Sequence, residues 1–515
     1  MNIETSLEHY FAGFERQIVG SNTNFSTPFG TRKIVYADWT ASGRAYAPIE
    51  NCIQSKILPY VANTHTDATI TGTLMSKAYE EAKQIIKKHA GAGDEDILIF
   101  CGSGMTGCVN KLQRILGLRI PGRITDYSHV NGENADRYFS IDKKLKPVVF
   151  ITHMEHHSNQ ISWLETIADV EIIQPASDGN VDLKHFIFLL EKYKERKHKI
   201  AAVTACSNVT GIQTPYFEIA RLIHKSGGLC FVDFACSAPY VDINMHPCQQ
   251  DSSLDAIYFS PHKFLGGVGA PGVLIFNKRI YNNKTPDQPG GGTIVYSNPW
   301  KEHEYVSDTE QKEDGGTPPF LGAIKAAMSI RLKEKMGIEN IQQREKEILK
   351  IVFNRFEKIS NIEVLAGHYR TRIGVVSFII RDAHYNLMVK MLNDRFGIQT
   401  RGGCSCAGTY GHVLLNVGKE ESHQILKKIR SHDFSSKPGW VRLSIHPCMS
   451  NTQVNFIMDA IEETAFRWKE WRNDYEYDAT SNRYFSTRFE SREQEIIKDW
   501  IDSSFSCYRE NGSIW

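Results

Sequence analysis

The feature that most constrains the fold is a series of short apolar runs that alternate with helix-like stretches between about residues 33 and 276. The runs are rich in β-branched and aromatic residues, as expected for strands buried on both faces. The stretch over 216–226 has amphipathic spacing and ends at Gly227 and Gly228, which favour helix termination. Strands alternating with helices predict βαβ units and a mainly parallel sheet. We expect strands at 97–100, 148–152, 170–173, 200–205, 229–233, 256–260 and 272–276, and helices at 76–90, 106–117, 182–193 and 216–226.

Changes in composition divide the chain further. A polar stretch over 119–146 interrupts the alternation and predicts a surface insertion. After Gly316-Thr317-Pro318-Pro319 comes a long helical pattern from 321 to about 359, followed by strand–helix alternation that predicts a smaller α+β unit. The expected organisation is an N-terminal segment (1–35), a large domain (36–320), a small domain (321–470) and an extension (471–515).

Charge and cysteine usage restrict the function classes. The 515 residues include 60 Lys and Arg against 59 Asp and Glu, so bulk charge attracts neither nucleic acid nor an anionic membrane. No apolar run approaches the roughly 18 residues of a membrane span, and the first residues lack the pattern of a secretion signal. The 11 cysteines are scattered, which is typical of reduced thiols. We expect a cytoplasmic enzyme with no nucleic-acid or membrane partner.

A lysine follows one of the predicted strands in the segment Ser260-Pro261-His262-Lys263-Phe264-Leu265-Gly266-Gly267. Parallel sheets bind ligands at the carboxyl ends of their strands. A lysine desolvated there has a depressed pKa and becomes nucleophilic, as covalent attachment of an aldehyde cofactor requires. A surface lysine in a glycine-rich turn would give the same local pattern.

Two further strand ends suggest which cofactor this is. Asp233 ends the strand at 229–233, where an acid would pair with a protonated pyridine nitrogen and make pyridoxal phosphate (PLP) a better electron sink, or would simply cap a helix. The turn at 102–107 contains Gly104, Met105 and Thr106 between a strand and a helix, which is a natural phosphate cradle. Many strand–helix turns share this pattern, so neither signal is specific by itself.

A histidine follows another strand end. His156, in Met154-Glu155-His156-His157-Ser158-Asn159, is placed to stack on a planar ring, although most single histidines are structural. A metal site formed by His153, His156 and His157 lacks further ligands at suitable spacing, so we predict no metal.

Taken together, Lys263, Asp233, His156 and the turn around Gly104 occur in the order and spacing of class V aminotransferase-type PLP enzymes. The chain resembles cysteine desulfurases, selenocysteine lyases and the sulfurase domain of molybdenum-cofactor sulfurase over about residues 35 to 463. The resemblance implies the PLP-dependent transferase fold of the aspartate aminotransferase-like type I. It also implies a homodimer in which the N-terminal segment packs with the small domain.

The resemblance assigns a role to each motif. Lys263 would bind PLP covalently and shuttle protons, Asp233 would pair with the pyridinium, and His156 would stack on the ring. Segments like those that contain His65 and Thr317 reach the neighbouring subunit's site in dimers of the family. Cofactor contacts are also implied for Gly104, Met105, Asn208 and Thr317, and phosphate contacts for Thr106, Ser260 and His262. Substrate contacts are implied for Asn208, His65 and Arg442.

The reaction depends on two positions in the small domain. Arg442 occupies the place of the arginine that binds the substrate α-carboxylate, a contact suited to a planar guanidinium, although a solvated strand arginine would fit the alternation too. The loop 401–408 resembles the segment with the sulfur-accepting cysteine, and Cys406 aligns better than Cys404. Cys404 and Cys406 could also form a redox pair, bind a metal ion or have no chemical role. Cys236 replaces the glutamine that many desulfurases place three residues after the pyridinium-pairing aspartate.

We therefore expect removal of sulfur or selenium from a cysteine-type amino acid through a persulfide on Cys406, with a sulfur-acceptor protein as a further partner. Alternatives are another class V reaction, such as transamination, epimerisation or side-chain hydrolysis, and a non-catalytic sulfur carrier or interaction protein.

Overall fold

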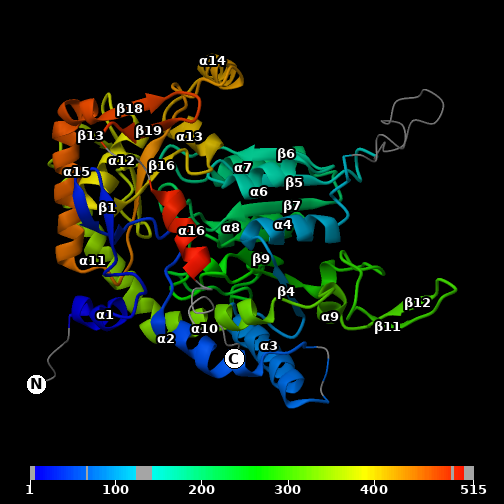
Figure 1. Ribbon diagram of the computed structural model, residues 1–515. Helices are drawn as coiled ribbons and strands as arrows, with labels where there is room; N and C mark the ends of the chain where they lie inside the picture. Colours follow the sequence, from blue (N-terminus) through cyan, green and yellow to red (C-terminus); the bar gives the residue numbers. More distant parts are fainter. Residues whose placement is uncertain (1–5, 65, 67, 123–141, 489–491, 504–515) are drawn as a thin grey trace, which may run out of the picture.

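The computed structural model describes residues 6–64, 66, 68–122, 142–488 and 492–503 (Figure 1). A seven-stranded sheet in the order β4-β10-β9-β8-β7-β5-β6 forms the centre of the larger part. The five strands from β9 to β6 are parallel, and β10 runs antiparallel to both of its neighbours. The strands are β4 (Asp96–Cys101), β5 (Val148–Thr152), β6 (Asp169–Ile173), β7 (Lys199–Thr204), β8 (Leu229–Asp233), β9 (Ala256–Phe259) and β10 (Gly272–Asn277). The predicted mainly parallel sheet is confirmed.

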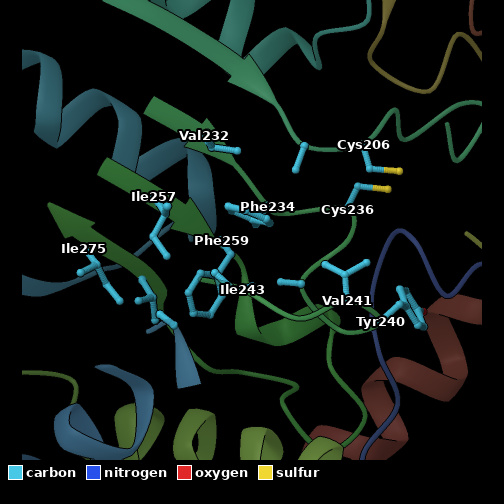
Figure 2. Close-up of a cluster of buried hydrophobic side chains, with 14 of the residues drawn as sticks. Cys206, Val232, Phe234, Cys236, Tyr240, Val241, Ile243, Ile257, Phe259 and Ile275 are labelled. Carbon is cyan, nitrogen blue, oxygen red and sulfur yellow. The ribbon is translucent and has the colours of Figure 1, made fainter. Parts of the chain in front are cut away.

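Helices cover both faces of this sheet, and alternate strand residues point into two separate cores. Phe150 lies in one core and the next residue, Ile151, in the other, as the two-residue period of a strand requires. Figure 2 shows part of the first core, where Val232, Ile257 and Ile275 come from neighbouring strands. The helices of this part are α2 (Ala47–Cys52), α3 (Ile70–His89), α4 (Gly104–Ile115), α6 (His157–Leu164), α7 (Leu183–Lys192), α8 (Tyr216–Lys225), α9 (Thr309–Glu313) and α10 (Phe320–Met336).

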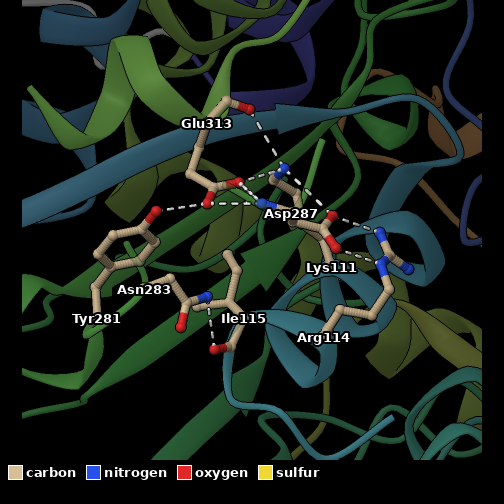
Figure 3. Close-up of polar contacts among 7 residues, drawn as sticks. All are labelled: Lys111, Arg114, Ile115, Tyr281, Asn283, Asp287 and Glu313. Carbon is tan, nitrogen blue, oxygen red and sulfur yellow. Dashed lines mark hydrogen bonds and ion pairs between the residues drawn. The ribbon is translucent and has the colours of Figure 1, made fainter. Parts of the chain in front are cut away.

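A buried polar network fastens the segment after β10 to helix α4 (Figure 3). Lys111 donates to the Glu313 carboxylate at 2.8 Å, and Tyr281 donates to the same carboxylate at 2.7 Å. Arg114 makes a two-pronged contact with Asp287 at 2.7 and 2.9 Å. Since Lys111 and Glu313 are both buried, loss of one partner would leave the other charge unpaired.

A four-stranded antiparallel sheet in the order β13-β14-β17-β16 forms a second unit with its own core. The N-terminal segment joins this unit, because β3 pairs in parallel with β15 through Val35 and Ile398. The elements are α1 (Leu7–Glu15), β1 (Asn24–Thr27), β2 (Gly30–Lys33), β3 (Val35–Tyr36), α11 (Ile338–Phe356), β13 (Ile362–Val364), β14 (Val375–Ile380), α12 (Tyr385–Phe396), β15 (Ile398–Gln399), β16 (Arg401–Gly403), α13 (Gly408–Leu414), α14 (Lys419–Arg430), β17 (Trp440–Ser444), α15 (Asn451–Trp471), β18 (Tyr475–Asp478), β19 (Arg483–Ser486) and α16 (Glu493–Ser503).

Short elements complete the fold: the hairpin of β11 (Ile294–Ser297) and β12 (His303–Tyr305), a π-helical turn at Ile53–Ile57, and 3₁₀ turns at Leu58–Tyr60, Pro261–Lys263, Lys278–Ile280 and Arg472–Asp474. Within the described part of the chain, no helix combines the length and the apolar character that crossing a membrane requires.

The long helical pattern predicted over 321–359 is confirmed as helical, but it is divided into two helices. Two helices occupy this stretch, and Gly337 separates them with a φ of +78°, a left-handed conformation that disfavours residues with a side chain. Most of the predicted insertion, residues 123–141, lies outside the described residues. The proposed domain boundaries stay predictions.

Candidate active site

A cavity of about 240 Å³ opens where the parallel strands end. Thr204 and Asp233 reach it from the last residues of β7 and β8, and His156 reaches it from the turn after β5. Residues from the small domain close the other side. The remaining predicted residues that line it are Met105, Thr106, Asn208, Ser260, His262, Lys263, Cys406 and Arg442.

Lys263 ends the 3₁₀ turn Pro261–Lys263 that follows β9. The turn is held by the Gly43 N–H, which donates to the His262 carbonyl at 2.9 Å. Burial lowers the pKa of the Lys263 amine, and the Arg442 and Arg401 cations lower it further against the opposing effect of Cys236 and Asp233. The turn therefore presents an amine with increased nucleophilic character to the cavity.

Asp233 is a buried carboxylate that forms no ion pair with the residues that the structure describes. Its Oδ1 accepts a hydrogen bond from the Ala235 N–H at 2.8 Å, which fixes the side chain. Burial raises the pKa of Asp233 to about 6, because this bond and the charge of Lys263 compensate only partly for desolvation. The site thus has a place for a cationic partner.

The beginning of α4 faces the cavity, and helix geometry gives its first N–H groups no acceptor within the helix. Its N-cap, Ser103, makes no side-chain capping bond, while the Met105 N–H donates to Ser260 Oγ at 2.9 Å. Gly104 has a φ of +59°, and a Cβ on it would lie 2.9 Å from Ser260 Oγ. Together with the Thr106 hydroxyl, 2.7 Å from the Ser158 hydroxyl, this helix end suits a phosphate group.

His156 is held in one orientation by the turn that contains it. It caps α6, with Nδ1 accepting from the Ser158 N–H at 3.1 Å. The preceding Glu155 joins the ends of β5 and β7, since its Oε1 accepts from the Thr152 hydroxyl at 2.6 Å and the Thr204 N–H at 2.9 Å. Burial first, and then the Lys263 charge, lower the pKa of His156 to about 3, so its imidazole is neutral.

Arg442 is buried rather than solvated, and both terminal nitrogens of its guanidinium have protein partners, whereas Nε has none among the described residues. It donates to Asp38 Oδ1 at 2.7 Å and to the Asn208 carbonyl at 3.1 Å. Arg401 donates to the other oxygen of Asp38 at 2.9 Å. Sequence reasoning missed the roles of Asp38 and Arg401, and the only signal was an acid directly after the short apolar run Val35-Tyr36-Ala37.

The cysteine loop is docked on the large domain by three hydrogen bonds. The His157 N–H donates to the Cys406 carbonyl at 2.7 Å, and His157 Nε2 accepts from the Gly408 N–H at 2.9 Å. Asn208 Nδ2 donates to the Ser405 carbonyl at 2.7 Å. Ser405 and Cys406 have φ values of +50° and +57°, each a strained conformation that costs about 1–3 kcal/mol and is typical of functional loops.

With this backbone conformation at Ser405 and Cys406, the two cysteines of the loop have different surroundings. Cys406 is exposed and lines the cavity, whereas Cys404 is half-buried and packs against an apolar cluster that includes Tyr410 and Trp440. The geometry therefore places the thiol of Cys406, and not that of Cys404, at the cavity.

Three buried polar atoms around the cavity have no partner among the described residues: Asn208 Oδ1, Ser405 Oγ and Arg442 Nε. Buried polar groups are nearly always hydrogen-bonded, so these atoms indicate a polar ligand. Of the other predicted residues, Gly104 and Thr317 are not among the residues that line the cavity, and Thr317 is exposed. His65 lies outside the described residues.

The comparisons agree with this geometry. The family model for aminotransferase class V matches residues 138–457. The chain belongs to the aminotransferase class V family. A probable cysteine desulfurase of Halalkalibacterium halodurans is 29% identical over 382 residues, which cover 73% of this chain and 84% of the relative. One from Staphylococcus aureus strain COL is 26% identical over 380 residues, with the same two coverages of 73% and 84%.

Solved structures share the fold of this class V chain. The apo cysteine desulfurase of Thermococcus onnurineus NA1 superposes with a TM-score of 0.68 at 22% identity, covering 88% of this chain and 98% of that one. The cysteine desulfurase CsdA of Escherichia coli gives a TM-score of 0.66 at 18% identity, covering 89% and 98%. The predicted family and the type I fold class are confirmed.

Proposed function

We propose that this protein is a PLP-dependent enzyme that removes sulfur or selenium from a cysteine-type amino acid. The observation that carries the proposal is the convergence on one cavity of Lys263, Asp233, a helix N-terminus and the exposed thiol of Cys406. The relatives named as probable cysteine desulfurases support the same reaction class.

The residues of the cavity fit PLP. The α4 end with Thr106, Ser260 and His262 would bind the phosphate, and Asp233 would pair with the ring nitrogen. His156 would stack on the ring as a neutral imidazole, and Lys263 would bind the aldehyde carbon. When bound, this cofactor supplies an electron sink for electrons released at the substrate's α-carbon.

The chain's own groups would then act in sequence. Arg442 would bind the substrate carboxylate with the guanidinium N–H groups that Asp38 and Asn208 leave open. Lys263 Nζ, displaced from the cofactor's aldehyde carbon by the substrate amine, would accept the α-proton. The Cys406 thiolate would attack the substrate sulfur. A sulfur–sulfur bond forms, the carbon–sulfur bond breaks with its electron pair going to carbon, and a proton on that carbon gives alanine. The persulfide sulfur would pass to an acceptor thiol, which we infer belongs to a partner protein.

Two further proposals concern assembly and location. We infer a homodimer, in which the exposed segment around Thr317 would reach the cavity of the second subunit, and a cytoplasmic location. Light scattering would test the first, since a monomer at micromolar concentration would contradict it.

Borohydride treatment of the PLP-loaded protein tests the cofactor assignment. We expect loss of visible absorbance and a reduced adduct on the Lys263 peptide, with no adduct in the Lys263→Ala variant. Assays with a panel of amino acids test the reaction; in the presence of dithiothreitol, which reduces the enzyme-bound sulfur or selenium, we expect alanine and sulfide or selenide in equal amounts. An adduct on another lysine would overturn the assignment, and products without sulfide or selenide would overturn the reaction.

A further inference from the structure

Two cysteines outside the proposed mechanism face the same cavity. Cys206 follows β7 and Cys236 follows β8, and both line the cavity wall together with Lys263. Figure 2 shows their sulfur atoms side by side and pointing the same way. Both thiols lie against one acceptor, the Ser207 carbonyl, with Sγ to O distances of 3.7 Å for Cys206 and 3.6 Å for Cys236.

The pair is chemically asymmetric. Burial raises the pKa of Cys206 well above its ordinary value, so this residue stays a thiol. The hydrogen bond from Cys206 lowers the pKa of Cys236, and the Lys263 and Arg442 charges lower it further, against burial and the Asp233 charge, which raise it. A thiol with a lowered pKa beside a second thiol is readily oxidised to a disulfide.

From the shared contact, the common cavity and the neighbouring cations, we infer that Cys206 and Cys236 form a redox modification site that hydroperoxides oxidise to a disulfide. The Cys236 thiolate attacks a peroxide oxygen, an S–O bond forms, the O–O bond breaks, and an alcohol or water leaves. The Cys206 sulfur then attacks Cys236, the S–S bond forms, and water leaves with the Cys206 proton. The two thiols lose two electrons and the hydroperoxide gains them.

This disulfide would alter the rest of the site by moving the short segment from Cys206 to Asn208. Cys206 lies two positions before Asn208, whose carbonyl accepts from Arg442 and whose amide donates to the Ser405 carbonyl. Drawing Cys206 toward Cys236 would shift this segment and weaken the docking of the cysteine loop. The inference goes beyond the proposed function, because the site depends on the cavity and its thiols and not on which amino acid is the substrate.

The chain offers an internal control. Cys101, in β4, and Cys108, in α4, are also buried and hydrogen-bonded to each other, but neither is among the residues that line the cavity. A small oxidant that enters through the cavity should therefore reach the first pair and not the second. General unfolding would expose both pairs equally.

The experiment treats the PLP-loaded protein with hydrogen peroxide, blocks free thiols with N-ethylmaleimide during unfolding, and maps peptides by mass spectrometry. It is run on the wild type and on a Cys404→Ser/Cys406→Ser variant, in which the loop thiols cannot react. We expect a linked peptide pair containing Cys206 and Cys236 in both proteins, its loss after dithiothreitol, and alkylated Cys101 and Cys108. Hydrogen exchange of residues 405–408 should be faster in the oxidised variant than in the reduced one.

Three outcomes would overturn the inference. They are separate alkylation of Cys206 and Cys236 after peroxide, linkage of Cys236 to another cysteine, and linkage of Cys101 to Cys108 at the same rate. None of these results bears on the borohydride adduct at Lys263, so the failure of this inference and that of the proposed function can be distinguished.

Discussion

Replacing Asp233 by asparagine tests the electrostatic centre of the site. The Asn side-chain oxygen can still accept from the Ala235 N–H, so the turn after β8 should persist. What disappears is the negative charge that would pair with the cofactor's ring nitrogen. Burial raises the pKa of Asp233 from 3.8 to about 6. At about 1.4 kcal/mol per pKa unit, this desolvation costs about 3 kcal/mol, which a cationic partner would recover.

Two opposite effects follow from that magnitude. Turnover of the PLP-loaded Asp233→Asn variant should fall by at least about 100-fold, because about 3 kcal/mol of charge stabilisation is lost. The cofactor-free variant should instead be more stable than the wild type at neutral pH. An aspartate with a raised folded-state pKa takes up a proton on folding. The unfolding free energy of the wild-type protein therefore falls as the pH rises from about 4 to about 6. The variant has no carboxyl group at this position, so its unfolding free energy does not fall in this way. The difference in unfolding free energy between the variant and the wild type should reach about 3 kcal/mol at pH 7 and vanish near pH 4.

The assay combines steady-state turnover with urea unfolding of both proteins at pH 4 and pH 7. Asp182→Asn is the matched control, because Asp182 caps α7 away from the cavity and asparagine caps a helix equally well. Its turnover should match the wild type. Near-normal turnover of Asp233→Asn would refute the reasoning, since Asp233 would then serve only as the acceptor for Ala235.

Three further substitutions test the roles of other residues at or near the cavity. Arg442→Ala should raise the KM for the amino acid at least about tenfold by removing a charge-assisted carboxylate contact, and an unchanged KM in steady-state kinetics would contradict that role. His157→Ala should remove the Nε2 contact with Gly408 and increase hydrogen exchange at 405–408, whereas unchanged exchange would mean that other contacts hold the loop. Gly272→Ala should lower both the melting temperature and the PLP affinity, because the new Cβ would lie 2.2 Å from the Gly104 carbonyl oxygen, and wild-type values in thermal and titration assays would argue against this close approach.

Much of the fold was predictable because buried parallel strands give long apolar runs. The strands at 148–152 and 229–233 have the predicted bounds. The break at Gly337 was not predicted, because the apolar pattern continues on both sides of it. A left-handed residue between two helices depends on how they pack, and packing is not visible in local periodicity.

The candidate site was predictable where a residue follows a strand, since strand ends converge at one edge of a parallel sheet. Lys263, Asp233 and His156 were predicted in this way, and all three line the cavity. Asp38 was missed because its partners, Arg401 and Arg442, lie more than 360 residues away in sequence. Such a contact follows from how the two domains meet and leaves no signal in spacing.

Mass spectrometry of the loop peptide after a single turnover with L-cysteine tests the central claim most directly. The account predicts one added sulfur atom on Cys406 and none on Cys404, because Cys406 lines the cavity and Cys404 does not. Cys406→Ala should keep the borohydride-sensitive cofactor on Lys263 but form neither alanine nor sulfide, and Cys404→Ala should keep turnover. A persulfide on Cys404, or full activity of the Cys404→Ala/Cys406→Ala double variant, would contradict the account.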